Sequence, residues 1–233
     1  MTQRTALSPS HHIAAAILCA SLALGCASAR SPRPATTAAT TAAPAAAAAH
    51  DMSTMTGMNV MTGMTGMDFP VTIPTGALYT EADVRFMQGM IAHHAQAIFM
   101  SRLAAAHQAS PRLQRFAIKI DQSQTTEIRL MQEWLRANGQ VAPDTSSYHS
   151  VMMPGMLTAE QIGQLDGAAG PAFDRLFLTL MIQHHNGALQ MVADLFATPR
   201  AGQDVDVSVF ANDVVSVQTA EIGLMHQMLD NLS

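Results

Sequence analysis

The sequence predicts an all-α fold, a four-helix bundle built from two duplicated helical hairpins, and three observations lead to this prediction. Apolar residues recur at helical spacing in four long segments, and no segment alternates apolar and polar residues as a half-buried strand does. Residues of the first half recur in the second. Short connections between long helices favour an antiparallel bundle. We place this bundle at residues 78–233, after a leader at 1–29 and a tail at 30–77.

Capping residues set the limits of the expected helices. Thr80, followed by two acids, begins a helix that continues to about residue 107, and Ser110-Pro111 begins one that ends at Asn138-Gly139. An irregular loop then runs to about residue 157. Thr158 and the residues after it have the capping-box pattern of a short helix. The last two long helices are expected at 170–198 and 206–231.

The two halves of the bundle repeat each other residue by residue. In the first helix of each half, Asp83, Phe86, Met90, Ile91, His93, His94, Ala97 and Met100 recur 91 residues later as Asp174, Phe177, Met181, Ile182, His184, His185, Ala188 and Met191. In the second helix, Gln124, Thr125, Glu127, Ile128, Leu130 and Met131 recur 94 residues later as Gln218, Thr219, Glu221, Ile222, Leu224 and Met225. Two similar hairpins related by a pseudo-twofold axis would therefore form the bundle.

Residues 1–29 have the pattern of an export signal, with Arg4 before an apolar run at 13–24 that is too short to span a bilayer. The segment 22–26 resembles a lipobox that would attach lipid to Cys26, whereas 27–29 fits ordinary signal cleavage and a soluble secreted form. We expect an exported lipoprotein of the periplasm or outer surface, bound to the membrane only through its lipid anchor. Because Cys19 and Cys26 both lie within this segment, the bundle contains no thiolate ligand.

The tail at 30–77 is expected to be disordered. It begins with Ala, Thr and Pro, and then places a methionine at every third position: Met52, Met55, Met58, Met61, Met64 and Met67. Thioether ligands select soft ions, above all Cu(I). A low-complexity linker that arose by local duplication is the alternative interpretation.

Within the bundle, helical spacing places histidines and methionines on the same faces. The residues expected to converge are His93, His94, His184, His185, Glu127, Glu221, Met90, Met181, Met100, Met191, Met131 and Met225. Small neighbours at Ala97 and Ala188 favour His93 and His184 as the axial pair. His94 and His185 share a face with Asp83 and Asp174, so we expect them to bind a carboxylate or a second ion. Alternatively, the histidines are hydrogen-bonded core residues and the methionines are core packing.

A further cluster of soft ligands lies in the central loop: His149, Met152, Met153 and Met156. It is either a third metal site or a cap folded over the end of the bundle. His107 and His226 have no counterpart in the other half, so we expect both at the surface.

These motifs resemble those of the family called domain of unknown function 305, which is ferritin-like. The resemblance covers residues 78–231 and rests on the two His-His helices, on Met153-Pro154-Gly155-Met156 and on the two Gln-Thr-x-Glu-Ile segments. It implies a ferritin-like four-helix bundle, export and, for some members, copper binding and copper tolerance. The His-His pairs replace the Glu-x-x-His motif of di-iron proteins, which speaks against oxygen or ferroxidase chemistry.

Together these features predict a binding protein that sequesters or transfers copper, with Cu(I) favoured and with envelope copper-handling proteins as partners. We expect no enzymatic activity and assign no catalytic residue. A formal charge of −5 with no basic stretch excludes nucleic acid as a partner. Two alternatives stay open: a ferritin-like oxidase holding iron or manganese, and a structural envelope protein without metal.

Overall fold

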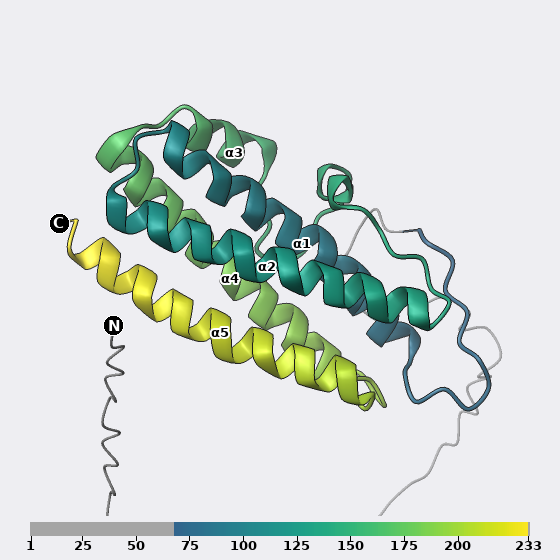
Figure 1. The fold of residues 1–233 in the computed structure, drawn as a ribbon. Coiled ribbons are helices and arrows are strands. Elements are labelled where there is room, and N and C mark those ends of the chain that lie inside the picture. The colour runs from purple at the N-terminus through teal and green to yellow at the C-terminus, as the bar shows by residue number, and fades with distance from the viewer. Residues whose placement is uncertain (1–67, 233) are drawn as a thin grey trace, which may run out of the picture. The chain divides into compact units, whose positions relative to one another are not determined.

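The computed structural model describes residues 68–232, and these form a helical bundle. The predicted signal, lipid anchor and methionine repeat lie outside the described residues. The four long helices are α1 (Glu81–Ala106), α2 (Pro111–Ala137), α4 (Gly170–Ala197) and α5 (Val205–Asp230), joined by the short helices η1 (Thr145–His149) and α3 (Ala159–Asp166) (Figure 1). The described residues include no β-strand, so the predicted all-α class is confirmed.

The helix starts follow the capping residues of the sequence. The Thr80 and Asp83 side chains form a capping box at the start of α1, Ser110 accepts from the Leu113 amide at the start of α2, and Thr158 with Gln161 caps α3. The sequence did not predict η1, which begins at Thr145 in the segment expected to be irregular. None of the described helices has the length and apolarity that a membrane crossing requires.

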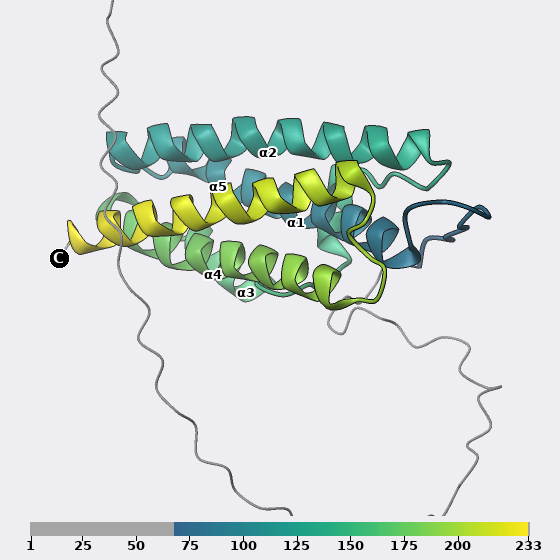
Figure 2. The same cartoon turned by 90° about the horizontal axis from the view of Figure 1, so that it is seen from below.

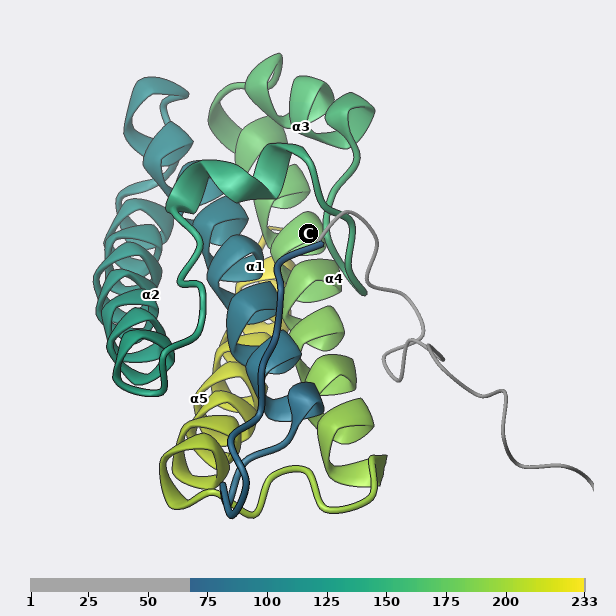
Figure 3. The same cartoon turned by 90° about the vertical axis from the view of Figure 1, so that its right-hand side faces the viewer.

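The helices pack in a defined order. Helix α1 packs against both α2 and α4, and α5 packs against α4 (Figures 2 and 3). Helices α2 and α5 lie on the same side of the bundle but do not pack closely along their length. This order places α1 and α4 at the centre, and it is these two helices that carry the paired histidines.

Two aspartates tie each hairpin to the turn of the other. Asp83, near the start of α1, accepts a 2.6 Å hydrogen bond from the Gly202 amide in the α4–α5 connection. Asp174, near the start of α4, accepts bonds of 3.0 and 3.2 Å from the Ser110 amide between α1 and α2. Both aspartates are almost fully buried, so these bonds satisfy carboxylates that would otherwise be costly to bury.

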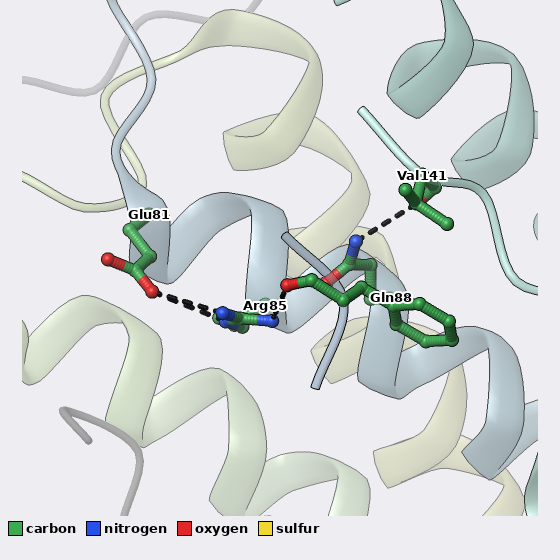
Figure 4. Close-up of polar contacts among 5 residues, drawn as sticks. Glu81, Arg85, Gln88 and Val141 are labelled. Carbon is green, nitrogen blue, oxygen red and sulfur yellow. Dashed lines mark hydrogen bonds and ion pairs between the residues drawn. The ribbon is translucent and has the colours of Figure 1, made fainter. Parts of the chain in front are cut away.

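Polar residues of α1 hold two extended segments of the chain, one that precedes α1 and one that follows α2. Arg85 donates to the Phe69 carbonyl at 2.8 Å and pairs with Glu81 at 3.2 Å, while Gln88 donates to the Val141 carbonyl at 2.9 Å (Figure 4). The Gln88 bond fixes the chain that leaves α2, and this chain leads to the segment covering the centre of the bundle.

The apolar core is divided into two clusters along the bundle, one on either side of a polar layer. The first cluster includes Phe86 and Leu195, and the second includes Phe177 and Leu113. Each fully buried side chain of this size stabilises the fold by roughly 1.5–3 kcal/mol. The residues between the clusters are polar, and they form the candidate site.

Candidate metal centre

Four histidines from the middle of α1 and α4 form the polar layer at the centre of the bundle. His93, His94, His184 and His185 are all buried, and the rings of His93 and His184 touch with their centroids 3.8 Å apart. Ala97 and Ala188, one turn further along each helix, are also fully buried, and their small side chains allow α1 and α4 to approach closely here. The two histidines expected to form the axial pair therefore lie together at the centre of the bundle.

The other two histidines each bind a glutamate of the neighbouring helix. His94 donates from Nε2 to Glu127 Oε2, and His185 donates from Nε2 to Glu221 Oε2, both at 2.7 Å. Burial alone would raise the pKa of Glu127, but the hydrogen bond and charge of His94 outweigh it, and the pKa lies below its ordinary value. The carboxylates that reach these histidines are thus the glutamates and not Asp83 and Asp174, which bind the turns described above.

His93 also has a fixed orientation, which a backbone carbonyl provides. Its Nε2 donates to the Pro154 carbonyl oxygen at 3.1 Å. Burial, reinforced by the nearby charge of His94, lowers the His93 pKa from 6.5 to about 3. The ring is therefore neutral at neutral pH, with its proton on Nε2 and a lone pair on Nδ1.

His184 differs from the other three because neither of its ring nitrogens has a hydrogen-bond partner. Burial and the neighbouring His93 lower its pKa well below 6.5, so this ring is neutral as well. The buried ring nitrogens without a partner are Nδ1 of His93, His94 and His185 and both nitrogens of His184. Buried polar atoms in native proteins almost always have a partner, so five such atoms in one layer require an explanation, such as a bound ion.

The segment 151–158 covers one side of this layer, and two residues of the central helices hold it there. The buried Gln96 amide donates to the Leu157 carbonyl at 3.0 Å and accepts from the Leu157 amide at 2.7 Å. On the facing helix, a Cβ at Gly187 would lie 1.9 Å from the Pro154 oxygen, so only glycine permits this approach. Neither residue was predicted from the sequence, although a glycine in the middle of an apolar helix is a signal of close backbone contact.

The six methionines predicted for the bundle site are all buried. They fall into two groups of three: Met90, Met131 and Met191 belong to the first apolar cluster, and Met100, Met181 and Met225 belong to the second. Each group takes one residue from each of three helices, and one group lies on either side of the histidine layer. The thioethers thus border the layer without all converging on one point.

The four residues of the predicted loop cluster do not lie together in the structure. Met153 and Met156 are buried and join the apolar cluster that contains Met90, whereas His149 and Met152 are exposed. The loop therefore lies against the middle of the bundle, and the prediction of a cap over the bundle end is wrong. His107, expected at the surface, is only 16% exposed and binds Asp166 at 3.0 Å.

Within the described residues, no three His, Asp or Glu side chains are arranged to hold one ion. The centre instead offers a contacting pair of neutral imidazoles, two further imidazoles oriented by carboxylates, and thioethers on either side. Such a donor set suits a soft ion of low coordination number better than a hard ion that needs several oxygens.

Comparison with known proteins supports the same assignment of the fold. The chain is similar to a crystal structure of a secreted DUF305 protein from Streptomyces coelicolor, with 27% identity and a TM-score of 0.56 over 65% of this chain and 93% of that one. A DUF305 fragment from Deinococcus radiodurans is 28% identical, with a TM-score of 0.57 over 66% of this chain and 98% of that one. The search of curated proteins gives no match.

A third similar structure is CopM in its Cu(I)-bound form, 27% identical with a TM-score of 0.51 over 64% of this chain and 96% of that one. CopM structures with bound silver and with Cu(II) match in the same way. The family model described as "Domain of unknown function (DUF305)" matches residues 83–229, which is more than half of the chain and includes both His-His helices. The chain therefore belongs to the DUF305 family, as the sequence motifs suggested.

Proposed function

We propose that this protein binds copper at the centre of its bundle, as an exported protein that sequesters or transfers the metal without catalysing a reaction. The observation that carries the proposal is the set of five buried ring nitrogens without a partner. A histidine that binds a metal usually donates its other ring N–H to a carboxylate or a backbone carbonyl. His93, His94 and His185 each make such a bond, to Pro154, Glu127 and Glu221.

The protonation of the histidines supports metal binding. Only a deprotonated ring nitrogen can bind a metal, and a proton competes for the same lone pair. The low pKa values of His93 and His184 leave both rings neutral throughout the neutral range, so no proton has to be displaced from their free nitrogens. In this proposal the two glutamates orient ligands and are not ligands themselves.

The ligand chemistry favours copper as Cu(I). Imidazole and thioether ligands suit soft ions, and the histidine layer lies between two groups of buried methionines. The similarity to CopM, whose structures contain Cu(I), Cu(II) and silver, points in the same direction. Iron and manganese are less suitable, because the two glutamates nearest the histidines are already engaged with His94 and His185.

The remaining parts of the proposal rest on the sequence. The methionines at 52–67 would capture Cu(I) outside the bundle, and an export signal would place the protein in the cell envelope, where copper-handling proteins would be its partners. The relative from Streptomyces coelicolor is described as a secreted protein, which supports export.

An anaerobic Cu(I) titration against a chromophoric competitor tests the proposal. Three variants of the whole chain are compared: His93→Leu with His184→Leu, replacement of the six tail methionines by leucine, and the control His226→Leu, which changes an exposed histidine of α5. We expect the tail variant and the control to keep one tight site and the double histidine variant to lose it. Tight binding that survives in the double variant and disappears in the tail variant would place copper in the tail and leave the buried histidines structural.

A further inference from the structure

The side of the bundle between α2 and α5 is more open than the others. These two helices run antiparallel on one side and do not pack closely (Figures 1 and 2). Two grooves lie between them instead. One groove, of about 490 Å³, lies between the C-terminal half of α2 and the N-terminal half of α5. The other, of about 190 Å³, lies between the N-terminal half of α2 and the C-terminal half of α5.

The two grooves carry opposite charges. The charged residues that line the larger groove are all acidic, namely Glu133, Asp206 and Asp213. Those that line the smaller groove are all basic, namely Arg112, Arg115 and Lys119. Two of these positions correspond in the 94-residue repeat, because Arg112 matches Asp206 and Lys119 matches Asp213. Matching places in the two halves of the sequence therefore differ in the sign of their charge.

Exposed apolar side chains accompany these charges. Leu130 and Val209 line the acidic groove and are 55% and 56% exposed, and Leu224 lines the basic groove and is 37% exposed. Aliphatic residues exposed to this extent along grooves with charged walls are typical of a surface that a protein partner covers.

We propose that a second copy of this chain covers the α2–α5 face. A twofold axis that lies in the interface and crosses α2 and α5 at right angles, midway between the grooves, exchanges the two ends of the face. The acidic groove of each copy then meets the basic groove of its partner, and the exposed aliphatic residues are covered together. A twofold interface needs a surface that is complementary to itself, and one acidic end with one basic end meets this condition.

The other in-plane twofold axis, which runs along the helices, would place like charges against one another, so the charges choose between the two arrangements. Dimerisation would also affect the metal centre. Glu127 and Glu221 lie one helical turn from Leu130 and Leu224, and their side chains are 23% and 16% exposed. A partner on this face would shield both carboxylates from water, although the dimer itself does not depend on copper.

Sedimentation velocity of the whole chain tests the proposal, and a monomer at every concentration measured would overturn it. Two charge-reversal variants are decisive: R112E/R115E/K119E makes both ends acidic, and E133K/D206K/D213K makes both ends basic. Each alone should raise the dimer Kd by about a hundred-fold, because like charges then meet at both ends. An equimolar mixture of the two should restore the dimer, since each acidic end again meets a basic one.

Controls separate this interface from other causes of dissociation. The variant E81K/E160K/D194K reverses three acids that line neither groove and should leave the dimer intact. Leu130→Ser with Leu224→Ser changes only exposed side chains, so it should weaken the dimer without loss of helical circular dichroism. A dimer that persists in both charge-reversal variants, or a mixture of the two that stays monomeric, would contradict the proposed interface.

Discussion

The central helices α1 and α4 carry two matching pairs of histidines, and one pair has the same surroundings in both helices whereas the other does not. His94 of α1 and His185 of α4 each bind a glutamate at the same distance of 2.7 Å. His93 and His184, by contrast, differ: His93 donates to the Pro154 carbonyl, whereas neither ring nitrogen of His184 has a hydrogen-bond partner. Three residues after His93 and His184, α1 has Gln96 and α4 has Gly187, and both residues contact the segment 151–158.

The difference arises because one connecting segment serves two similar helices. Its Pro154 carbonyl accepts a hydrogen bond from His93 and none from His184. On either side of the segment, α1 provides the Gln96 amide that binds it and α4 provides the glycine that makes room for it. His93 is consequently held in one tautomer and orientation, whereas no hydrogen bond of a ring nitrogen fixes His184. A repeat in the sequence thus produces one histidine with a fixed orientation and one without such a restraint.

The largest expected effect is a loss of stability in acid, measured on metal-free protein. The pKa of His93 is about 3 in the folded state and 6.5 without the fold, and that of His184 is also lowered, so the unfolded chain binds more protons below pH 6.5. The stability from these neutral rings is therefore fully present above pH 6.5 and is lost as the pH falls, by about 1.4 kcal/mol per pH unit for His93 down to about 3 and with the same sign for His184. In urea unfolding at a series of pH values, the free energy of unfolding should depend less steeply on pH in His93→Leu and in His184→Leu than in the parent protein. An unchanged pH dependence in either variant would mean that the fold does not hold that ring neutral.

The second-largest effect is expected for Gln96, whose side-chain amide binds the segment 151–158. Gln96→Leu leaves the buried amide and carbonyl of Leu157 without partners, which should cost about 3 kcal/mol of unfolding free energy. Gln124→Leu is the matched control, because this buried glutamine has no partner for its Oε1 and its loss should cost less than about 1 kcal/mol. Chemical denaturation of both variants measures the free energy of unfolding. An equal loss in the two variants would show that Gln96 does not hold the segment 151–158 in place.

The glycine of the facing helix should show a smaller effect. In Gly187→Ala the new Cβ would overlap the Pro154 and Gly155 backbone, and displacing the segment should cost about 2 kcal/mol. Gly223→Ala in α5 meets no atom within 4 Å and should stabilise the fold by about 0.5–1 kcal/mol through helix propensity. Thermal unfolding of the two variants should show a lower melting temperature for Gly187→Ala and a higher one for Gly223→Ala. If both variants were more stable, the segment 151–158 would be able to move away from α4 at no cost.

The smallest effect is expected for the glutamates that bind His94 and His185, because these two contacts are the same in both halves. Glu127→Gln and Glu221→Gln weaken the orientation and basicity of His94 and His185, and each should lower Cu(I) affinity by roughly ten-fold. Because the two contacts have the same length, the two losses should be equal in a competition titration. A loss confined to one variant would show that the ion is bound on one side of the layer.

Much of the fold could be predicted from the sequence, because its determinants are local. Thr80, Ser110 and Thr158 cap their helices as expected, and the apolar spacing gives the four long helices. The contact between His93 and His184 was also predictable, since the small residues one turn away indicated a close helix crossing. These predictions depend on side chains whose identity the sequence states.

The details of the centre could not be predicted, because backbone atoms determine them. The carbonyl that holds His93 belongs to Pro154, and a carbonyl oxygen has no signature of its own in a sequence. Likewise, the shared face of His94 and Asp83 suggested the wrong carboxylate, because helix periodicity does not show that Asp83 binds the Gly202 amide instead. Only the packing of the second hairpin decides which acid a histidine meets.

Asp83 and Asp174 each bind the turn of the other hairpin, and these hydrogen bonds affect how the chain folds. Asp83 binds the turn of the second hairpin and Asp174 binds the turn of the first, so a hairpin on its own lacks the carboxylate that accepts from its turn amide. Neither half is therefore expected to fold alone, and the two should form in a single cooperative transition. Amide exchange at Ser110 and Gly202 should then report global unfolding at both sites, although they are 92 positions apart in the sequence.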